Sequence, residues 1–439
     1  MSVVENLGVK ETVIGSLPIE WQISSLRDAG KIVSGGTPST SMEEYWEGDI
    51  YWCTPTDITR LSGRRTIQST ERKITNEGLR NSGAVLIEKN SVLVCTRATV
   101  GVCAINAMPI TTNQGFKSIT PNEFFTSDYL YYAITNLQSE LKKKAGGSTF
   151  LEINKTEFEK ILICKPPLHE QRGISSILNT VDDKLDVIFG QIEATQTLKQ
   201  GLMQTLFSRG VGTQSTNGFW LAHTEFKKNG TLELPVGWSL VRLGDIAPLI
   251  RRPVKINLNA TYPELGLRSY GKGTFHKPAL LGDNVGNKRL FEIKTGDLLF
   301  SNVFAWEGAV AVAKSEDSGR FGSHRYITCT VDESRADTSY VFRYLVTPAG
   351  IASLTLASPG GAGRNKTLGL EALANITMPL PPLAEQQKIS QILDDVETKI
   401  KTLELKQSHY QTLKRGLMQK LLTGEWRVKL DDPTPTTEQ

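Results

Sequence analysis

The pattern of apolar positions in this chain predicts two long amphipathic helices. In both, apolar residues recur with alternating steps of four and three, a heptad spacing that keeps a narrow seam facing a partner helix. In the first helix the seam runs through Ile174, Leu178, Val181, Leu185, Ile188 and Ile192. In the second it runs through Ile389, Leu393, Val396, Ile400 and Leu403, then through Gln407 and Tyr410 to Leu413, Leu417 and Leu421. We therefore expect a coiled-coil pair.

The two helices belong to an internal repeat. PPLHEQ at 166–171 returns as PPLAEQ at 381–386, and GLMQ at 201–204 returns at 416–419, both 215 residues later. Ahead of the helices, LPIEW at 17–21 returns as LPVGW at 234–238. Fixed-period self-similarity of this kind indicates a repeated architecture. Since residues 10–21 also resemble 227–238, joining the C-terminus to the N-terminus would reproduce the internal junction, which predicts a pseudo-twofold arrangement with antiparallel helices.

Between the conserved anchors the two halves diverge, and each reads as a mixed module of strands and helices. Short β-rich runs occur at 84–87, 92–95, 298–300 and 309–312, and helical patterns at 128–144 and 340–346. The fold class is therefore α+β: two globular modules and a coiled coil. The expected segments are an N-terminal extension (1–16), the first module (17–165), the central helix (166–209), a linker (210–233), the second module (234–380), the C-terminal helix (381–424) and a tail (425–439).

Composition adds few constraints. The chain has 439 residues, 50 of them basic and 46 acidic, so its net charge of +4 alone does not indicate nucleic-acid binding. Its five cysteines form no CxxC pair, which argues against a zinc site. No apolar run has the length of a membrane span, so we expect a cytoplasmic protein without a membrane partner.

The duplicated Pro-Pro-Leu-x-Glu-Gln motif, the heptad helix behind it and the Gly-Leu-Met-Gln motif resemble the specificity (S) subunit of type I restriction-modification enzymes. The resemblance covers residues from about Lys10 to Val428. It implies that the two modules are target recognition domains, each reading one half of a split, asymmetric site in double-stranded DNA. It also implies that the helices set the spacing between half-sites. The implied partners are two methyltransferase (M) subunits and two endonuclease-translocase (R) subunits.

Motifs for catalysis are missing from the sequence. There is no Gly-x-x-x-x-Gly-Lys-Ser/Thr loop for ATP, no Asn-Pro-Pro-Tyr segment for adenine methylation and no His-Glu-x-x-His for a metal. We therefore expect no catalytic and no metal-binding residue here, with S-adenosylmethionine, ATP and Mg²⁺ bound by the partner subunits. The alternative is a protein scaffold whose two lobes bind protein rather than DNA.

Candidate DNA contacts are basic, amide and aromatic residues in loops that follow strands, because such groups anchor phosphates and read base edges. Any one of them could instead be an ordinary surface residue, and Trp306 could belong to the core. Gln407 and Tyr410 could fix the helix register or dock the methyltransferase. The candidates in the first module are Thr37, Arg60, Arg64, Arg65, Lys73, Arg97, Asn113, Gln114 and Lys117. Those in the second are Arg251, Arg252, Arg268, Tyr270, Lys272, Trp306, His324, Arg325, Arg364 and Lys366.

Overall fold

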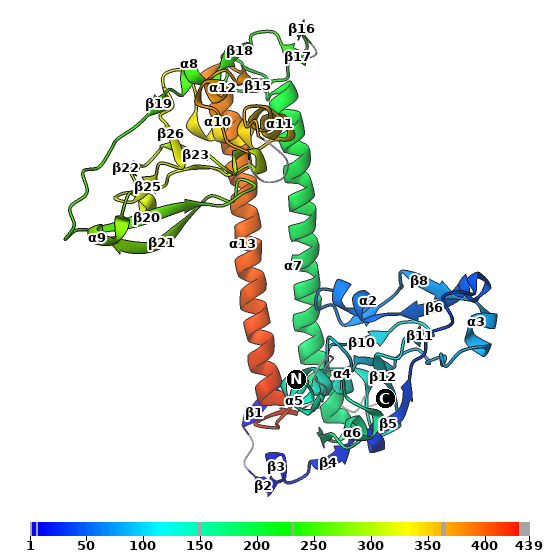
Figure 1. Cartoon of the computed structure of the whole chain (residues 1–439). Coiled ribbons are helices and arrows are strands. Elements are labelled where there is room, and N and C mark those ends of the chain that lie inside the picture. Colours follow the sequence, from blue (N-terminus) through cyan, green and yellow to red (C-terminus); the bar gives the residue numbers. More distant parts are fainter. Residues whose placement is uncertain (1, 6–7, 147–151, 231, 361–365, 430–439) are drawn as a thin grey trace, which may run out of the picture. The chain divides into compact units, whose positions relative to one another are not determined.

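The computed structural model of the chain describes residues 2–5, 8–146, 152–230, 232–360 and 366–429 (Figure 1). Its contacts divide the chain into two compact units. Unit 1 contains Met1–Gln191 and Leu403–Gln439, and unit 2 contains Ile192–Thr402. The predicted long helices are α7 (Leu168–Arg209) and α13 (Leu383–Leu421), and each contributes one part to each unit. Both begin at the residue directly after the Pro-Pro pair, as expected because prolines cannot continue a preceding helix or strand.

Unit 1 is a mixed lobe of short helices and sheets. Its core sheet has the strand order β5-β12-β9-β10-β7, and a smaller sheet has the order β11-β6-β8. Strands β4 and β13 pair antiparallel, as do β2 with β3 and β1 with β28. The strands are β1 (Ser2–Glu5), β2 (Val9–Thr12), β3 (Gly15–Pro18), β4 (Gln22–Ser25), β5 (Gly30–Ser34), β6 (Trp46–Cys53), β7 (Thr66–Ile67), β8 (Arg72–Ile74), β9 (Val92–Cys95), β10 (Cys103–Asn106), β11 (Thr111–Thr112), β12 (Phe116–Pro121), β13 (Leu162–Lys165) and β28 (Trp426–Lys429). The short helices are α1 (Leu26–Ala29), η1 (Glu43–Tyr45), α2 (Pro55–Arg60), α3 (Asn76–Arg80), α4 (Ser127–Asn136), α5 (Gln138–Lys144) and α6 (Lys155–Glu159).

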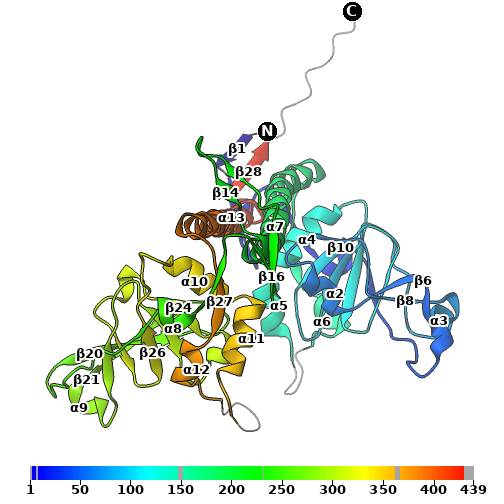
Figure 2. The same cartoon turned by 90° about the horizontal axis from the view of Figure 1, so that it is seen from above.

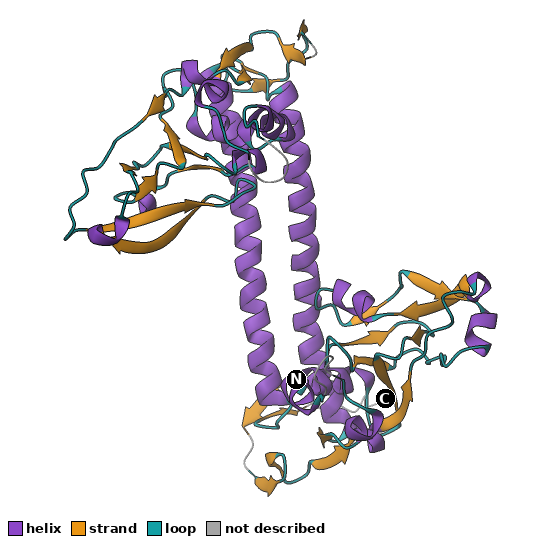
Figure 3. Cartoon of the chain, viewed as in Figure 1, coloured by secondary structure: helices purple, strands orange, loops and turns teal. Residues whose placement is uncertain are grey.

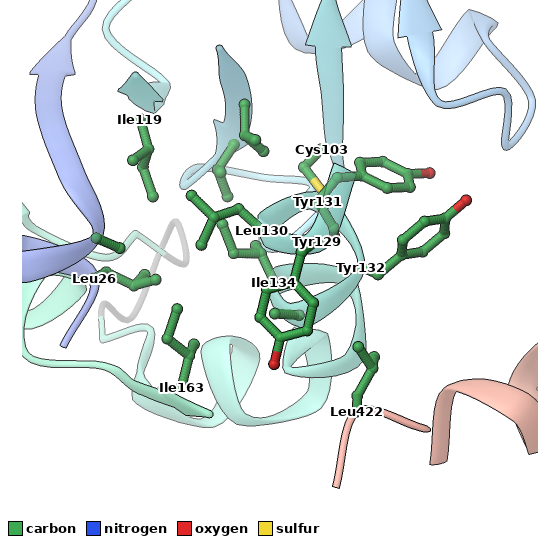
Figure 4. Packing of buried hydrophobic residues seen from close by; sticks show 14 of the residues in the cluster. Leu26, Cys103, Ile119, Tyr129, Leu130, Tyr131, Tyr132, Ile134, Ile163 and Leu422 are labelled. Atoms are coloured by element: carbon green, nitrogen blue, oxygen red, sulfur yellow. Dashed lines mark hydrogen bonds between the residues drawn. The ribbon is translucent and has the colours of Figure 1, made fainter. Parts of the chain in front are cut away.

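Helix α4 carries the centre of the core of unit 1. Thr126 caps its first turn by accepting a hydrogen bond from the Tyr129 backbone N–H. Tyr129, Leu130 and Ile134 are buried among side chains from several strands, including Ile119, and beside Leu422, which directly follows α13 (Figure 4). The lobe is therefore fixed to the helix pair by the same side chains that fill its interior.

Two details of the predicted secondary structure are wrong. The single helix expected over 128–144 is two helices, α4 and α5, because the backbone leaves helical geometry at Leu137, whose ψ is 6°. The strand expected over 84–87 is only one isolated bridge, between Ile87 and Ile110. In that run Val85 and Leu86 are exposed while Ala84 and Ile87 are buried, and Ile87 is the residue that pairs with a neighbouring segment.

Unit 2 repeats the central part of this architecture. Its first sheet has the order β19-β26-β23-β24 and its second β21-β20-β25-β22, while β18 pairs with β27. The strands are β14 (Thr213–Gln214), β15 (Trp220–Leu221), β16 (Phe226–Asn229), β17 (Leu232–Pro235), β18 (Ser239–Arg242), β19 (Leu249–Ile250), β20 (Thr261–Leu267), β21 (Thr274–Leu281), β22 (Leu290–Glu292), β23 (Leu298–Ser301), β24 (Val310–Val312), β25 (Phe321–Ser323), β26 (Tyr326–Cys329) and β27 (Thr377–Leu380). The short helices are α8 (Leu243–Ile246), α9 (Gly282–Val285), η2 (Ala305–Glu307), η3 (Ser315–Asp317), α10 (Thr338–Leu345), α11 (Pro348–Leu356) and α12 (Leu370–Ala374).

The central sheet has the same strand arrangement in the two lobes although their sequences diverge. The order β5-β12-β9-β10 in unit 1 corresponds to β19-β26-β23-β24 in unit 2, and every neighbouring pair in both sets is antiparallel. A helix lies on the equivalent strand in each lobe, with α4 against β10 and α10 against β24 (Figure 2). Outside this core, different strands and turns are added in each lobe (Figure 3).

Within each unit the two long helices run antiparallel. In unit 1 the Lys414 ammonium lies 2.7 Å from the Asp182 carboxylate, and in unit 2 Lys199 lies 2.8 Å from Glu397. The first seam is buried or half-buried throughout, as predicted. The second seam departs from the prediction at Leu413, which is 49% exposed.

Leu413 is exposed because a straight α-helix has 3.6 residues per turn rather than the 3.5 of a strict heptad. The buried face therefore drifts along a long helix. After Tyr410 the inward position is Lys414 instead of Leu413, since the Lys414 side chain is 14% exposed. Met418, at 6% exposed, is then buried beside the half-buried Leu417. The pattern of apolar residues does not reveal Lys414 as an inward position, because its side chain is charged and pairs with the buried Asp182 carboxylate.

A buried glutamate in the first turn of each long helix ties three segments together. In unit 1, Glu170 accepts hydrogen bonds from the Trp21 indole N–H at 2.8 Å, from the Arg427 guanidinium at 2.6 and 2.9 Å and from the Val428 backbone N–H. Glu170 is only 1% exposed. The hydrogen bond from Arg427 to Glu170 raises the pKa of the arginine.

Unit 2 contains the equivalent arrangement around Glu385. It accepts hydrogen bonds from the Trp238 indole N–H at 2.9 Å and from the backbone N–H groups of Val211 and Gly212, both at 2.9 Å. The His223 ring nitrogen lies 2.9 Å from the same carboxylate. In each unit the chain that leaves one long helix is thus bound by the start of the other, which is the repeated junction that the sequence predicted.

A second anchor joins each lobe to the side of its helix. In unit 1, Asp182 accepts a hydrogen bond from the Tyr132 hydroxyl at 2.7 Å as well as the ion pair with Lys414. In unit 2, Glu397 accepts from the Arg343 guanidinium at 2.7 Å as well as from Lys199. Burial alone would raise the pKa of Glu397, but the hydrogen bonds from Arg343 and Lys199 lower it to about 2. The carboxylate therefore stays charged and holds both elements.

Candidate nucleic-acid interface

In unit 1 three loops meet at one end of the core sheet. The loop after β9 is bound to the loop before β12 by the Thr96 N–H, which donates to the Gly115 carbonyl at 2.8 Å. The Gly36 N–H, after β5, donates to the Thr112 carbonyl at 2.9 Å. A Cβ at Gly35 would lie 2.1 Å from the Asn113 carbonyl oxygen, so only glycine allows this close approach.

These loops bring together several of the predicted side chains. The Thr37 hydroxyl donates to the Gln114 side-chain oxygen at 2.5 Å. Gln114 is exposed, and its amide nitrogen remains a possible donor to a ligand. Asn113 uses its side-chain oxygen to accept from the Gly115 N–H at 2.9 Å, so its role is to shape the loop. Arg97 is exposed and forms an ion pair with Glu152 at 2.8 Å. We define Thr37, Arg97, Asn113 and Gln114 as the unit 1 loop cluster.

The other candidates of unit 1 lie elsewhere. Arg64 lies over the Phe189 ring of α7 at 5.5 Å, and Arg65 is within 3.0 Å of Asp183 on the same helix. Arg60 pairs with Glu71 on the surface, and Lys73 lies 4.7 Å from the centre of the Tyr51 ring. Lys117 is 6% exposed, and burial lowers its pKa.

Unit 2 contains a corresponding set of loops. The Asn302 N–H, after β23, donates to the Arg325 carbonyl at 2.7 Å, and the Leu368 N–H donates to the Asn302 carbonyl at 2.8 Å. The turn between β20 and β21 joins them, since the Tyr270 N–H donates to the Glu307 carbonyl at 2.8 Å.

The predicted side chains in these loops are mainly cationic or aromatic. The Lys366 ammonium lies 4.7 Å from the centre of the Trp306 ring, which is half-buried and therefore contributes to both the interior and the surface. The Lys272 ammonium lies 5.8 Å from the centre of the exposed Tyr270 ring. We define the unit 2 loop cluster by its members, which are Arg268, Tyr270, Lys272, Trp306, His324, Arg325 and Lys366.

Three candidates of unit 2 are not in this cluster. Arg252 forms two hydrogen bonds with the Asp297 carboxylate, at 2.6 and 3.0 Å, and these raise the pKa of the arginine. Arg251 lies over the Phe291 ring at 5.0 Å. Arg364 lies outside the described residues.

The two clusters occupy equivalent positions in their lobes. The bond from Thr96 to Gly115 corresponds to the bond from Asn302 to Arg325, and the bond from Ile153 to Thr96 corresponds to that from Leu368 to Asn302. This correspondence aligns Gln114 with His324, each exposed and each two residues before its core strand. The sequence did not reveal this alignment, because the modules share no motif at these positions.

Other chemistry is limited in the described part of the chain. Among those residues, no group of three or more histidine, cysteine or acidic side chains is arranged to hold a metal ion. Burial raises the pKa of the Cys95 and Cys329 thiols to about 12, which disfavours the reactive thiolate. No helix in the described ranges is long and apolar enough to cross a membrane.

Comparison with known proteins identifies the class to which this architecture belongs. The family described as "Type I restriction modification DNA specificity domain" matches residues 18–195 and 235–410. The chain belongs to this family, with one domain in each half. It is therefore a specificity subunit with DNA sequence recognition domains, rather than a catalytic subunit.

Individual relatives agree with this assignment. The chain is 36% identical over 241 residues to the type I restriction enzyme MjaIX specificity subunit of Methanocaldococcus jannaschii, a match that spans 54% of either chain. It is 24% identical to the MjaVIII specificity subunit of the same organism over 94% of both chains. Among solved structures, the S subunit of a type I system from M. genitalium has the same fold, with a TM-score of 0.55, 13% identity and coverage of 92% of this chain and 96% of that one.

Proposed function

We propose that this chain recognises a bipartite, asymmetric site in double-stranded DNA and reads one half-site with each lobe. The observation that carries the proposal is the pair of equivalent loop clusters, one per lobe, formed by equivalent backbone hydrogen bonds but bearing different side chains. Equivalent positions present each lobe's side chains in the same way, and different side chains give each half-site its own sequence. Cations would anchor phosphates, while amide, imidazole and guanidinium groups would read base edges.

Within this proposal the candidate residues have different roles. Arg97, Arg268, Lys272, Arg325 and Lys366 supply charge inside the loop clusters. Outside them, Arg60, Arg64, Lys73 and Arg251 are proposed as phosphate contacts. Arg60 and Arg97 are exposed although each has a carboxylate partner, whereas the Arg65 and Arg252 side chains are only 22% and 18% exposed beside theirs. We therefore assign Arg65 and Arg252 to stabilising their own units. Arg364 is proposed as a DNA contact from the sequence alone.

We further propose that the chain assembles two methyltransferase subunits and two endonuclease-translocase subunits. The support is the duplication itself, because the Glu170 and Glu385 junctions present the same construction twice and so suit two copies of one partner. A solved structure with the same fold, at a TM-score of 0.52, is described as the structural basis of "complex assembly" in a type I system. S-adenosylmethionine, ATP and Mg²⁺ would then be bound by the partner subunits.

The rival function is a scaffold whose lobes bind only protein. Salt distinguishes the two, because neutralising phosphates releases counterions and makes DNA affinity fall steeply as salt rises. A scaffold would bind specific and random duplexes equally weakly. Expressing the chain with its methyltransferase and sequencing the methylated positions defines the specific duplex for this test.

Removing one side chain at the aligned position should relax recognition in one half-site only. We expect Gln114→Ala to weaken binding of the specific duplex by about 1–3 kcal/mol and to relax one base pair of the first half-site. His324→Ala should do the same in the second half-site. The measurement is a binding competition among duplexes with single base changes.

Two variants control for the loss of a polar group as such. Asn76→Ala and His409→Ala remove an exposed amide and an exposed imidazole outside both loop clusters, and we expect wild-type selectivity from each. If Gln114→Ala and His324→Ala relax the same half-site, or neither relaxes any position, the assignment of one cluster to one half-site is wrong.

A further inference from the structure

Tyr270 combines an exposed aromatic ring with a backbone conformation that aromatic residues rarely adopt. Its φ is 63°, in the left-handed region, and the following Gly271 also has a φ of 63°. Two successive residues with positive φ are typical of a tight hairpin turn, where asparagine and glycine are preferred. The Tyr270 side chain is nevertheless 72% exposed, so no burial of the ring accounts for a tyrosine at this position.

The surrounding structure holds the turn in this conformation. The Tyr270 N–H donates to the Glu307 carbonyl and the Gly271 N–H to the Gly308 carbonyl, both at 2.8 Å. The Ser269 hydroxyl donates to the Glu307 carboxylate at 3.0 Å. A Cβ on Gly271 would lie 2.9 Å from the Val346 side chain, so the turn is packed closely on its other side as well. A strained residue that its neighbours hold in place from several directions is a feature of ligand-binding sites.

The charge around the ring favours a nucleic-acid ligand over a protein one. The Lys272 ammonium lies 5.8 Å from the centre of the Tyr270 ring, and the Arg268 guanidinium lies 5.1 Å from the centre of the Phe275 ring. The Lys366 ammonium lies over the Trp306 ring. The nearby carboxylate of Glu307 is hydrogen-bonded to Ser269. Cations grouped around a fixed, projecting aromatic ring can bind the phosphates that flank a base step while the ring reaches the bases.

We propose that Tyr270 is a wedge that inserts its ring between two neighbouring base pairs in or beside the second half-site, unstacking them and bending the duplex. This inference rests on the proposed DNA recognition and adds a function to it. Inserted side chains bend DNA at the cost of a base stack, and the bent duplex gains contacts with the protein. A rigid turn suits this task because the ring direction is set before DNA arrives, so little ordering is needed on binding.

The test uses the full-length chain in complex with its methyltransferase and duplexes that carry 2-aminopurine, a base that brightens when it is unstacked, at successive positions. We expect one step at the second half-site to brighten with wild type and with Tyr270→Phe, which keeps the ring. Tyr270→Gly removes the ring and adopts positive φ without strain. It should abolish the brightening and weaken specific binding by about five- to a hundredfold. Phe219→Ala removes an aromatic residue that is also 72% exposed, in the linker, and should change nothing.

The outcomes separate this inference from the function on which it rests. If wild type binds the specific duplex selectively but brightens no position, or if Tyr270→Gly brightens the same step as wild type, the wedge is refuted and the recognition proposal stands. If wild type does not prefer the specific duplex over a random one, the recognition proposal itself fails, and the wedge fails with it.

Discussion

Inserting four residues into each long helix should lengthen the gap between the two DNA half-sites by about one or two base pairs. The sites for insertion are between Gln191 and Ile192 in α7 and between Thr402 and Leu403 in α13, where the chain passes from one unit to the other. Contacts inside each unit are kept there. Four residues add about 6 Å of helix at ~1.5 Å per residue, and a duplex rises ~3.4 Å per base pair.

The length of four is chosen because it is close to one helical turn, so each seam returns nearly to the face that meets its partner. Inserting one residue in each helix instead rotates the following seam by about 100° and should abolish specific methylation. The measurement is the methylated sequence in cells that carry each variant with the partner methyltransferase. An unchanged gap with full activity in the four-residue variant would show that the helices do not set the spacing.

The largest effect on stability is expected from Glu170→Ala. The substitution leaves the Arg427 guanidinium, the Trp21 indole N–H and the Val428 N–H without their buried acceptor. Removing one partner of a buried ion pair typically costs about 3–5 kcal/mol, because an uncompensated charge stays behind. Urea unfolding of the full chain should therefore show a lower midpoint for unit 1.

The matched control is Glu20→Ala, which removes the other carboxylate partner of Arg427. Its side chain is 70% exposed, so water and salt already screen the interaction and little change is expected. Should Glu170→Ala unfold at the same urea concentration as Glu20→Ala, the junction is not an important source of stability. Because Glu385 occupies the equivalent position, Glu385→Ala should lower the stability of unit 2 in the same way.

The two long helices and the internal duplication could be predicted because both follow from local sequence patterns that occur twice. Heptad spacing depends only on residues three and four apart, so a seam that repeats from Ile174 to Ile192 indicates a helix and its buried face. The prediction was wrong at Leu413 because accumulated drift moved Lys414 into the seam, and only the position of Asp182 on the other helix makes a lysine suitable there.

The lobes were harder to predict because their chemistry depends on contacts between distant segments. Arg64 and Arg65 look like surface cations in sequence, but they lie against Phe189 and Asp183, more than a hundred residues away. Tyr132 and Arg343 occupy corresponding anchors although one is aromatic and the other a cation. The alignment of Gln114 with His324 follows from backbone hydrogen bonds, which leave no trace in residue type.

Exchanging one lobe shows whether each lobe reads its own half-site. Residues 234–380 are replaced by the matching segment of a relative that methylates a different sequence, and the methylated positions are then sequenced in cells carrying the chimaera and the partner methyltransferase. If each lobe reads its own half-site, the second half-site changes to that of the relative while the first half-site is retained. A chimaera that is active but changes both half-sites, or neither, would contradict the claim that recognition is divided between the two lobes.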